Sequence, residues 1–253
     1  MAVDFSKLPD VSKEHPDLAP DEQVFLAHMK AREDAFFRVF GDTAPKNEML
    51  SPGDPDLMDN WPAGGIYKYA PRKGRTGWHY VTHGLAQPFV VPEDEDDEPL
   101  PGEQRISGFG IELVVSTPQE CDWAPQLLLN FVRYLLFEKE ATVFLPGDRI
   151  PCAAFVEIEA KTKVSHLLCV QSPEYESEIL LPAGSCTLVH LVGTTTAEIA
   201  RAKSLGPDGP GSEVLFSVLL ALGISPVTDL KRRCATSNPR FDKTWDRVQK
   251  KRG

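Results

Sequence analysis

The alternation of apolar and polar positions predicts both helices and strands along this chain. Apolar residues recur at helical spacing within residues 21–40, where Pro20 and Asp21 suit the start of a helix and Gly41 suits its end. Residues 109–116 alternate instead, with every second residue apolar, as a half-buried strand requires. A second helix is expected after Asp122, and its apolar residues lie nearly all round, so we expect it to be buried on most sides.

Further elements follow from shorter patterns. The segment 42–77 is rich in Gly and Pro and indicates loops and short pieces. Thr195 and Glu198 form a capping-box pattern at the start of a helix, and Ser212 and Gly223 suit the cap and the end of the next helix. The last predicted helix, 239–251, is basic, and we expect its aromatic residues to pack it against the rest of the domain. Strands are predicted at 78–82, 153–160, 164–170 and 186–192.

The order of these elements favours one α+β domain with a mixed, mainly antiparallel sheet packed with helices, because no regular βαβ alternation is present. We expect a poorly ordered N-terminal segment at 1–19 and a single domain over 20–253. The acidic run at 93–98, EDEDDE, lies between prolines and is interpreted as a solvated loop, with a contact to a metal or a basic partner as the alternative.

Composition narrows the function classes. The chain has 253 residues and a net charge of −10, which disfavours binding to nucleic acid. Residues 231–253 nevertheless carry nine Lys or Arg and two Asp or Glu, a local charge of +7. No apolar run reaches the length of a membrane-spanning helix and the N-terminus lacks a signal-peptide pattern, so we expect a cytoplasmic protein without membrane association. Five cysteines without a CxxC pattern favour buried thiols over disulfides or zinc, and no cofactor is expected.

Motifs for common enzyme chemistry are absent from the sequence, which has no GxSxG, Walker A or HExxH pattern. His79 and His83 lie four apart on a predicted strand, about 13 Å along the backbone, which is too far for both to bind one metal ion. Asp148 in a Pro-Gly-Asp turn, followed by Glu159 and Lys161 on a predicted strand, resembles the pattern of Mg²⁺-dependent nucleases. The ordinary alternation of an amphipathic strand also explains this pattern, and we keep the nuclease as the alternative function.

Several short segments, taken in order, resemble the N-terminal domain of the Suppressor of fused family. They cover the chain from about residue 20 to about residue 250, and their order and spacing carry the resemblance more than any one of them does. The matching segments are 78–82 with Gly84 and Leu85, 107–113, 123–134, Phe144 with Gly147 and Asp148, 191–198, and 227–233.

The resemblance implies an α+β domain without known catalytic activity. In the animal protein, this domain and a second one close around a peptide that adds as a β-strand. The family's contact residues fall on Tyr134, Phe144 and Asp148 by motif match, with two extra residues between Tyr134 and Asp148. Because this sequence stops at Gly253, we expect no C-terminal domain and no two-domain clamp within one copy.

Single-domain relatives are typical of bacteria, where the family is associated with immunity proteins that neutralise toxins. The sequence therefore predicts a non-enzymatic, protein-binding module that sequesters or neutralises a partner, which is a peptide strand or a toxin with a basic surface. A scaffold that forms homodimers through the basic C-terminal helix is a third interpretation.

Overall fold

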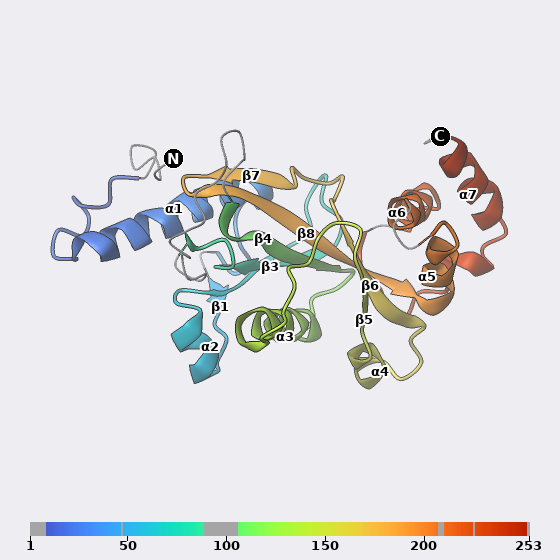
Figure 1. Cartoon of the computed structure of the whole chain (residues 1–253), viewed down its shortest axis with the longest axis horizontal. Helices are drawn as coiled ribbons and strands as arrows, with labels where there is room; N and C mark the ends of the chain where they lie inside the picture. The colour runs from blue at the N-terminus through green and yellow to red at the C-terminus, as the bar shows by residue number, and fades with distance from the viewer. Residues whose placement is uncertain (1–8, 47, 89–105, 207–209, 225, 252–253) are drawn as a thin grey trace.

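The computed structural model describes residues 9–46, 48–88, 106–206, 210–224 and 226–251 (Figure 1). Helices and strands alternate irregularly along the chain, as expected for an α+β domain. The elements are α1 (Pro20–Phe40), β1 (Met49–Leu50), α2 (Pro55–Asn60), β2 (Gly65–Tyr69), β3 (Trp78–His83), β4 (Ile106–Thr117), α3 (Trp123–Phe137), β5 (Arg149–Pro151), α4 (Ala154–Ile158), β6 (Val164–Val170), β7 (Glu178–Leu181), β8 (Gly184–Thr195), α5 (Thr196–Lys203), α6 (Gly211–Ala221), the 3₁₀ helix η3 (Ala235–Ser237) and α7 (Phe241–Lys250).

One sheet organises the molecule, with the strand order β1-β2-β3-β4-β8-β6-β5 and with β7 also paired to β8. The two long central strands, β4 and β8, pair in parallel, and the other neighbours pair antiparallel. The predicted mixed, mainly antiparallel sheet is therefore confirmed. Because β6 and β7 both pair with β8, the segment that connects them, 171–177, lies along the same side of that strand.

Helices cover both faces of this sheet, because successive residues of its central strands point to opposite sides. Leu113 and Val115 pack into the cluster that contains the apolar side of α3, together with residues of α2 and α4. Val114 packs on the other face, under α1. At the far end of that second face lie α5, α6 and α7, packed on β6 and β8 (Figure 1).

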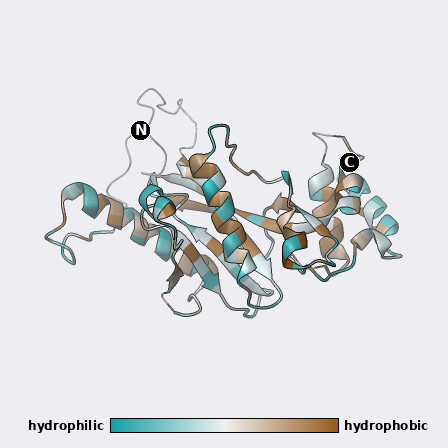
Figure 2. Cartoon of the chain, turned by 90° about the horizontal axis from the view of Figure 1, so that it is seen from below, coloured by the Kyte–Doolittle hydropathy of each residue, from teal (hydrophilic) through white to brown (hydrophobic). Residues whose placement is uncertain are grey.

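Helix α3 crosses the first face of the sheet, as the view from below shows (Figure 2). It buries most of its surface, as predicted, and Val132 and Leu128 are fully enclosed. Its exposed residues recur at helical spacing and form one narrow stripe, which consists of Gln126, Asn130, Arg133 and Phe137.

The strand predicted at 153–160 is wrong. After Pro151 the chain leaves the sheet and forms α4, a single helical turn that buries Phe155 and exposes Val156 and Ile158. The alternation of Val156, Ile158 and their acidic neighbours suggested a strand, but one buried aromatic residue decides which backbone conformation packs. Four strands were not predicted. β1 and β2 lie in the segment 42–77, which was interpreted as loops and short pieces, and β5 and β7 are only three and four residues long.

Two helix starts predicted from capping residues have different outcomes. The capping box at α5 is confirmed, since Glu198 Oε2 accepts a hydrogen bond from Thr195 N at 2.8 Å. The predicted cap at Ser212 is wrong, because α6 begins at Gly211 after Pro210 and Ser212 lies within its first turn. Gly223 follows the end of α6 with a φ of 75°, as predicted for a helix stop.

Predictions for two polar segments concern residues that the structure does not fully describe. The acidic run 93–98 lies outside the described residues, as do residues 1–8 of the predicted N-terminal segment. Within the described ranges, none of the helices is long and apolar enough to cross a membrane. The five cysteines are free thiols, and Cys152, Cys169 and Cys186 are buried.

Candidate functional site

Strand β5 forms one end of the sheet and pairs only with β6 among the described strands. Ile150 lies opposite Leu167 in an antiparallel register, and Cys152 N donates to Ser165 O at 2.9 Å. Because alternate residues of an antiparallel strand turn their backbone groups toward the partner strand, the N–H and C=O of Arg149 face away from β6. The described sheet therefore has a free edge at Arg149, where another strand can pair.

The aromatic residues predicted to bind a partner meet in the apolar cluster against which Ile150 of β5 also packs. The rings of Tyr134 and Phe144 have centroids 5.6 Å apart, and those of Phe131 and Phe144 are 5.0 Å apart. Phe144 is only 8% exposed, whereas Tyr134 is half-buried. Thr142 N donates to Tyr134 Oη at 3.1 Å, which holds the loop after α3 against that helix. Tyr134 thus covers Phe144 and presents its hydroxyl group nearer the surface.

Asp148 lies in a tight turn directly before β5. Its carboxylate Oδ2 accepts from Leu145 N at 2.7 Å, and its own backbone N–H donates to Leu145 O at 3.0 Å. Gly147 has a φ of 108°, a conformation that side chains rarely adopt, and its N–H donates to Cys169 O at 2.8 Å. The turn fixes the exposed carboxylate at the start of the free edge.

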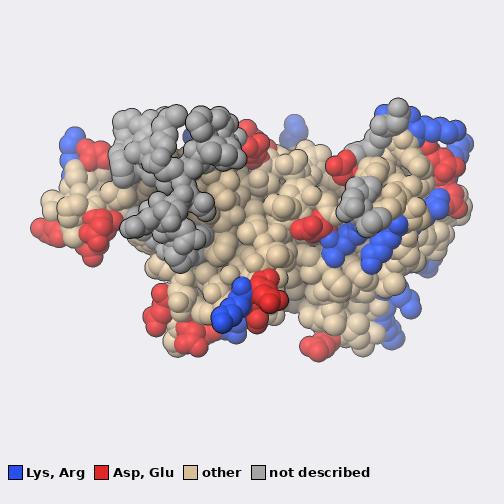
Figure 3. All heavy atoms as spheres, viewed as in Figure 1, with Lys and Arg blue, Asp and Glu red and all other residues tan. Residues whose placement is uncertain are grey.

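A pocket with a volume of about 430 Å³ opens beside this turn, lined by Gly147, Asp148, Arg149 and Lys203. Arg149 Nε donates to the buried Ser212 Oγ at 2.7 Å, and Ser212 Oγ donates to Gly147 O at 2.6 Å. Figure 3 shows Lys and Arg side chains gathered at the end of the molecule that carries α5, α6 and α7. Sequence reasoning missed Arg149, Lys203 and Ser212, because α5 and α6 reach the turn only through tertiary packing.

The residues of the predicted nuclease site do not have the arrangement that this interpretation requires. Glu159 follows α4, and Lys161 lies in the next turn, where its N–H donates to Glu159 Oε1 at 3.3 Å. The expected strand that carries both residues is absent, so the premise of the nuclease interpretation is wrong. Across the described part of the chain, no three His, Cys, Asp or Glu side chains are grouped so that they can hold a metal ion.

His79 and His83 lie on β3, as predicted, and each has its own surroundings. His83 Nε2 accepts from Arg32 Nε at 3.1 Å beneath α1, and burial, followed by the charge of Arg32, places the pKa of His83 well below its usual value. His79 Nε2 lies 3.4 Å from Glu174 Oε2, and burial lowers the pKa of His79 as well. Both histidines are parts of the interior.

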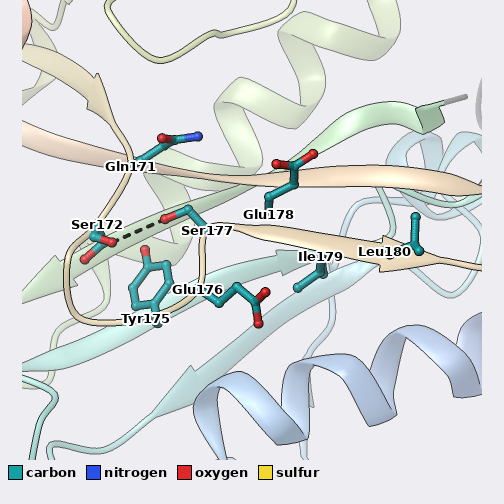
Figure 4. Close-up of a pocket in the computed structure, with 8 residues that line it drawn as sticks. All are labelled: Gln171, Ser172, Tyr175, Glu176, Ser177, Glu178, Ile179 and Leu180. Carbon is teal, nitrogen blue, oxygen red and sulfur yellow. Dashed lines mark hydrogen bonds between the residues drawn. The ribbon is translucent and has the colours of Figure 1, made fainter. Parts of the chain in front are cut away.

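A second pocket, of about 560 Å³, lies along the segment that joins β6 to β7 (Figure 4). Polar residues dominate it, and Ser177 Oγ donates to Ser172 O across the loop at 3.3 Å. The residues around it come from one continuous segment, 171–180, and none of them belongs to a predicted site. The edge of β5 is therefore the stronger candidate.

Comparison with known proteins points to one family. The family model described as Suppressor of fused protein (SUFU) matches residues 61–233. Several solved structures have similar folds, including the following three. The crystal structure of Drosophila Suppressor of Fused has a TM-score of 0.54 and 21% identity, over 74% of this chain and 46% of that one. This chain thus spans less than half of the Drosophila chain.

The other two structures are matched over nearly their whole length. The chain from the Sufu–Fu complex has a TM-score of 0.59 and 20% identity, over 89% of this chain and 96% of that one. The SUFU homologue from Neisseria gonorrhoeae FA 1090 has a TM-score of 0.53 and 15% identity, over 83% and 96%. No curated protein matches the sequence. At these identities the structures show a shared fold.

Proposed function

The chain belongs to the Suppressor of fused family, and on that basis we propose that it is a module that binds and sequesters a protein partner without catalysis. The observation that carries the proposal is the free edge of β5, which begins directly after Asp148 and whose Ile150 packs against the same apolar cluster as Tyr134. A solved structure with this fold comes from a Sufu–Fu complex, so the fold occurs in an assembly of two proteins.

An extended segment of the partner would pair with β5 and continue the sheet. The backbone groups of Arg149 provide the main-chain hydrogen bonds, which supply affinity but little sequence preference. Preference then comes from the side chains on either face of the added strand. On one face lie Tyr134 and Phe144, and we propose that Tyr134 contacts the partner while Phe144 supports it from below.

Neutralisation of a bacterial toxin is the form of sequestration that we propose. The Neisseria gonorrhoeae homologue with the same fold supports a bacterial setting. The net charge of −10 would also accelerate association with a basic toxin, because long-range attraction raises the encounter rate. Such steering depends on the total charge of the chain and does not determine which charged groups meet at the interface.

Affinity capture from cells of the source organism tests the proposal. The purified chain and three variants serve as bait: Tyr134→Ala, Asp148→Asn and, as a matched control, Asp10→Asn. Asp10 also accepts a hydrogen bond from a backbone N–H, that of Ser12 at 3.2 Å, but it lies in the N-terminal segment. We expect one protein to be captured by the wild type and by Asp10→Asn, and to be reduced about tenfold or more with the other two variants.

Hydrogen exchange then locates the contact. In the reconstituted complex, the backbone N–H of Arg149 should exchange more slowly than in the free chain, because a paired strand protects it. Equal capture by Tyr134→Ala, Asp148→Asn and the wild type, or unchanged exchange at Arg149, would rule out this surface.

A further inference from the structure

The free edge of β5 has two faces with different chemistry. The side chain of Ile150 packs against the apolar cluster that contains Phe144 and Phe155. The side chain of Arg149 points the other way and reaches Ser212 at the start of α6. Because neighbouring strands share the same two faces, successive side chains of a strand paired with β5 would meet these two environments alternately.

Arg149 is held in one orientation on its face. Its Nε donates to Ser212 Oγ, and that hydroxyl donates in turn to Gly147 O in the Asp148 turn. Ser212 is 4% exposed, so this anchor belongs to the interior. With Nε used in this way, the two terminal nitrogens of the guanidinium remain for a ligand, and in the described structure neither has a carboxylate within 4 Å.

Lys203 supplies a second positive charge from a different element. It lies in the last turn of α5 and lines the same pocket as Arg149. Its influence extends to β6, since burial, followed by the charge of Lys203, lowers the pKa of His166, the residue opposite Pro151 in the sheet. Because it lines this pocket together with Arg149, Lys203 borders the edge at which a partner strand would pair.

Among the described residues, Asp148 provides the one carboxylate that lines the pocket. Its Oδ2 is already occupied by Leu145 N, so part of its hydrogen-bonding capacity serves the turn. The lining that the structure describes therefore holds two cations and one anion, around a volume of about 430 Å³ that can hold a side chain. A net positive pocket of this kind is complementary to a carboxylate.

We propose that the pocket of Arg149 and Lys203 binds an acidic side chain of the partner strand. This inference rests on the proposed function and adds a sequence preference to it. The bound segment would carry Asp or Glu flanked on both sides by apolar residues, which face the side of Tyr134. On that side α4 exposes Val156 and Ile158, which are 54% and 42% exposed, so the apolar positions find apolar surface.

A phage-displayed library of random decapeptides tests the preference directly. The purified full-length chain is the target, in parallel with Lys203→Gln, Arg149→Gln and, as a control, Lys73→Gln. Lys73 is an exposed cation in the turn between β2 and β3, so its loss changes the net charge equally and leaves the pocket intact. Lys203 is exposed at a helix end, so Lys203→Gln is expected to fold even if Arg149→Gln does not.

We expect the wild type and Lys73→Gln to enrich peptides with an acidic residue between two apolar ones. The two pocket variants should enrich apolar alternation without the acidic residue. The most enriched peptide, labelled with fluorescein, should bind about tenfold more weakly when its acidic residue is changed to the amide, and this difference should shrink in Lys203→Gln.

The outcomes separate the two proposals. Two results would overturn the acidic preference and leave strand binding at β5 in place. In the first, the wild type enriches peptides that alternate but lack an acidic residue. In the second, both pocket variants still enrich peptides with the acidic residue. A selection that enriches no peptide above background with any target overturns both.

Discussion

Arg232 donates two parallel hydrogen bonds to Glu198, from Nη1 to Oε1 at 2.7 Å and from Nη2 to Oε2 at 2.5 Å. Glu198 is fully buried at the start of α5 and also accepts from Ala235 N at 2.6 Å. The same carboxylate closes the capping box with Thr195. One side chain therefore joins α5 to the segment that leads into α7.

We expect Glu198→Ala to lower the free energy of unfolding by about 3–5 kcal/mol, because it leaves Arg232 buried without its partner. Glu22 is the matched control, since its carboxylate likewise accepts from the backbone N–H of the residue before its helix, Ala19, but at the surface. Glu22→Ala should cost about 1 kcal/mol. Urea unfolding followed by circular dichroism compares the two, and equal losses would show that the Arg232 contact contributes little.

The stability that Glu198 contributes should depend on pH. Burial by itself raises the pKa of Glu198, but the hydrogen bonds and charge of Arg232, with the N–H groups of Ala235 and Thr195, outweigh it and hold the pKa below its usual 4.5. An acid with a lowered pKa in the folded state stabilises fully above its unfolded pKa. The contribution is lost as the pH falls through the folded value.

The stability difference between the wild type and Glu198→Ala should therefore be constant from pH 7 to about pH 5 and shrink below about 4.5. Urea unfolding at a series of pH values measures it. A difference that grows as the pH falls would contradict the assigned direction of the pKa shift.

Two buried ionisable side chains, Arg32 and Glu112, lie under α1. Arg32, which is 1% exposed, donates to Gln87 Oε1 at 2.5 Å. Burial raises the pKa of Glu112, and the charge of Arg32 offsets part of that rise. Glu112 in turn accepts from Gly84 N at 2.9 Å. We expect Arg32→Met to cost about 3–5 kcal/mol, because it leaves Glu112 without a balancing charge. Arg32→Met combined with Glu112→Gln should be more stable than the sum of the single losses predicts, which a double-mutant cycle measures.

The short helix α4 buries Phe155 and exposes Val156, whereas the predicted strand would bury Val156. The two structures therefore predict opposite effects on stability for substitutions at these positions. Phe155 is fully buried, whereas Val156 is 54% exposed. Phe155→Ala should therefore destabilise the fold by about 3–5 kcal/mol, and Val156→Lys by no more than about 0.5 kcal/mol. Thermal unfolding of both variants checks this order. A larger loss for Val156→Lys would restore the strand that the alternation at 153–160 suggested.

The sequence predicts the elements in which the pattern is long and the packing simple. Strand β4 and helix α3 were located within a few residues, because their apolar periods extend over several turns or pairs. The strand prediction for 153–160 was wrong because the alternation there fits a helix or a strand. The choice between the two depends on the burial of Phe155 and on the end of β5 at Pro151.

The candidate site was predictable only in part. Tyr134 and Asp148 came from the family resemblance, since no local pattern marks them. Arg149 is adjacent to Asp148 in the sequence, but its role depends on Ser212, which α6 brings to it. Lys203 reaches the same pocket from α5. Contacts between elements far apart in the chain are set by packing on the sheet, and periodicity within one segment does not encode them.

Tyr134 should matter to the loop after α3 even without a partner. Its Oη accepts from Thr142 N at 3.1 Å, and its ring packs on Phe144. Tyr134→Phe keeps the ring and removes the hydroxyl, so we expect a loss of about 1 kcal/mol in stability. The backbone N–H of Thr142 should exchange with deuterium roughly five- to tenfold faster, because its acceptor is gone.

Phe144→Ala should behave differently, since Phe144 is 8% exposed and lies between Phe131 and Tyr134. Its loss should cost about 3–4 kcal/mol and accelerate exchange across the whole loop. Native-state hydrogen exchange of both variants distinguishes the roles. A Tyr134→Phe variant whose exchange at Thr142 equals that of the wild type would show that the hydroxyl does not hold the loop. In that case a loss of partner binding in Tyr134→Phe has to be assigned to direct contact alone.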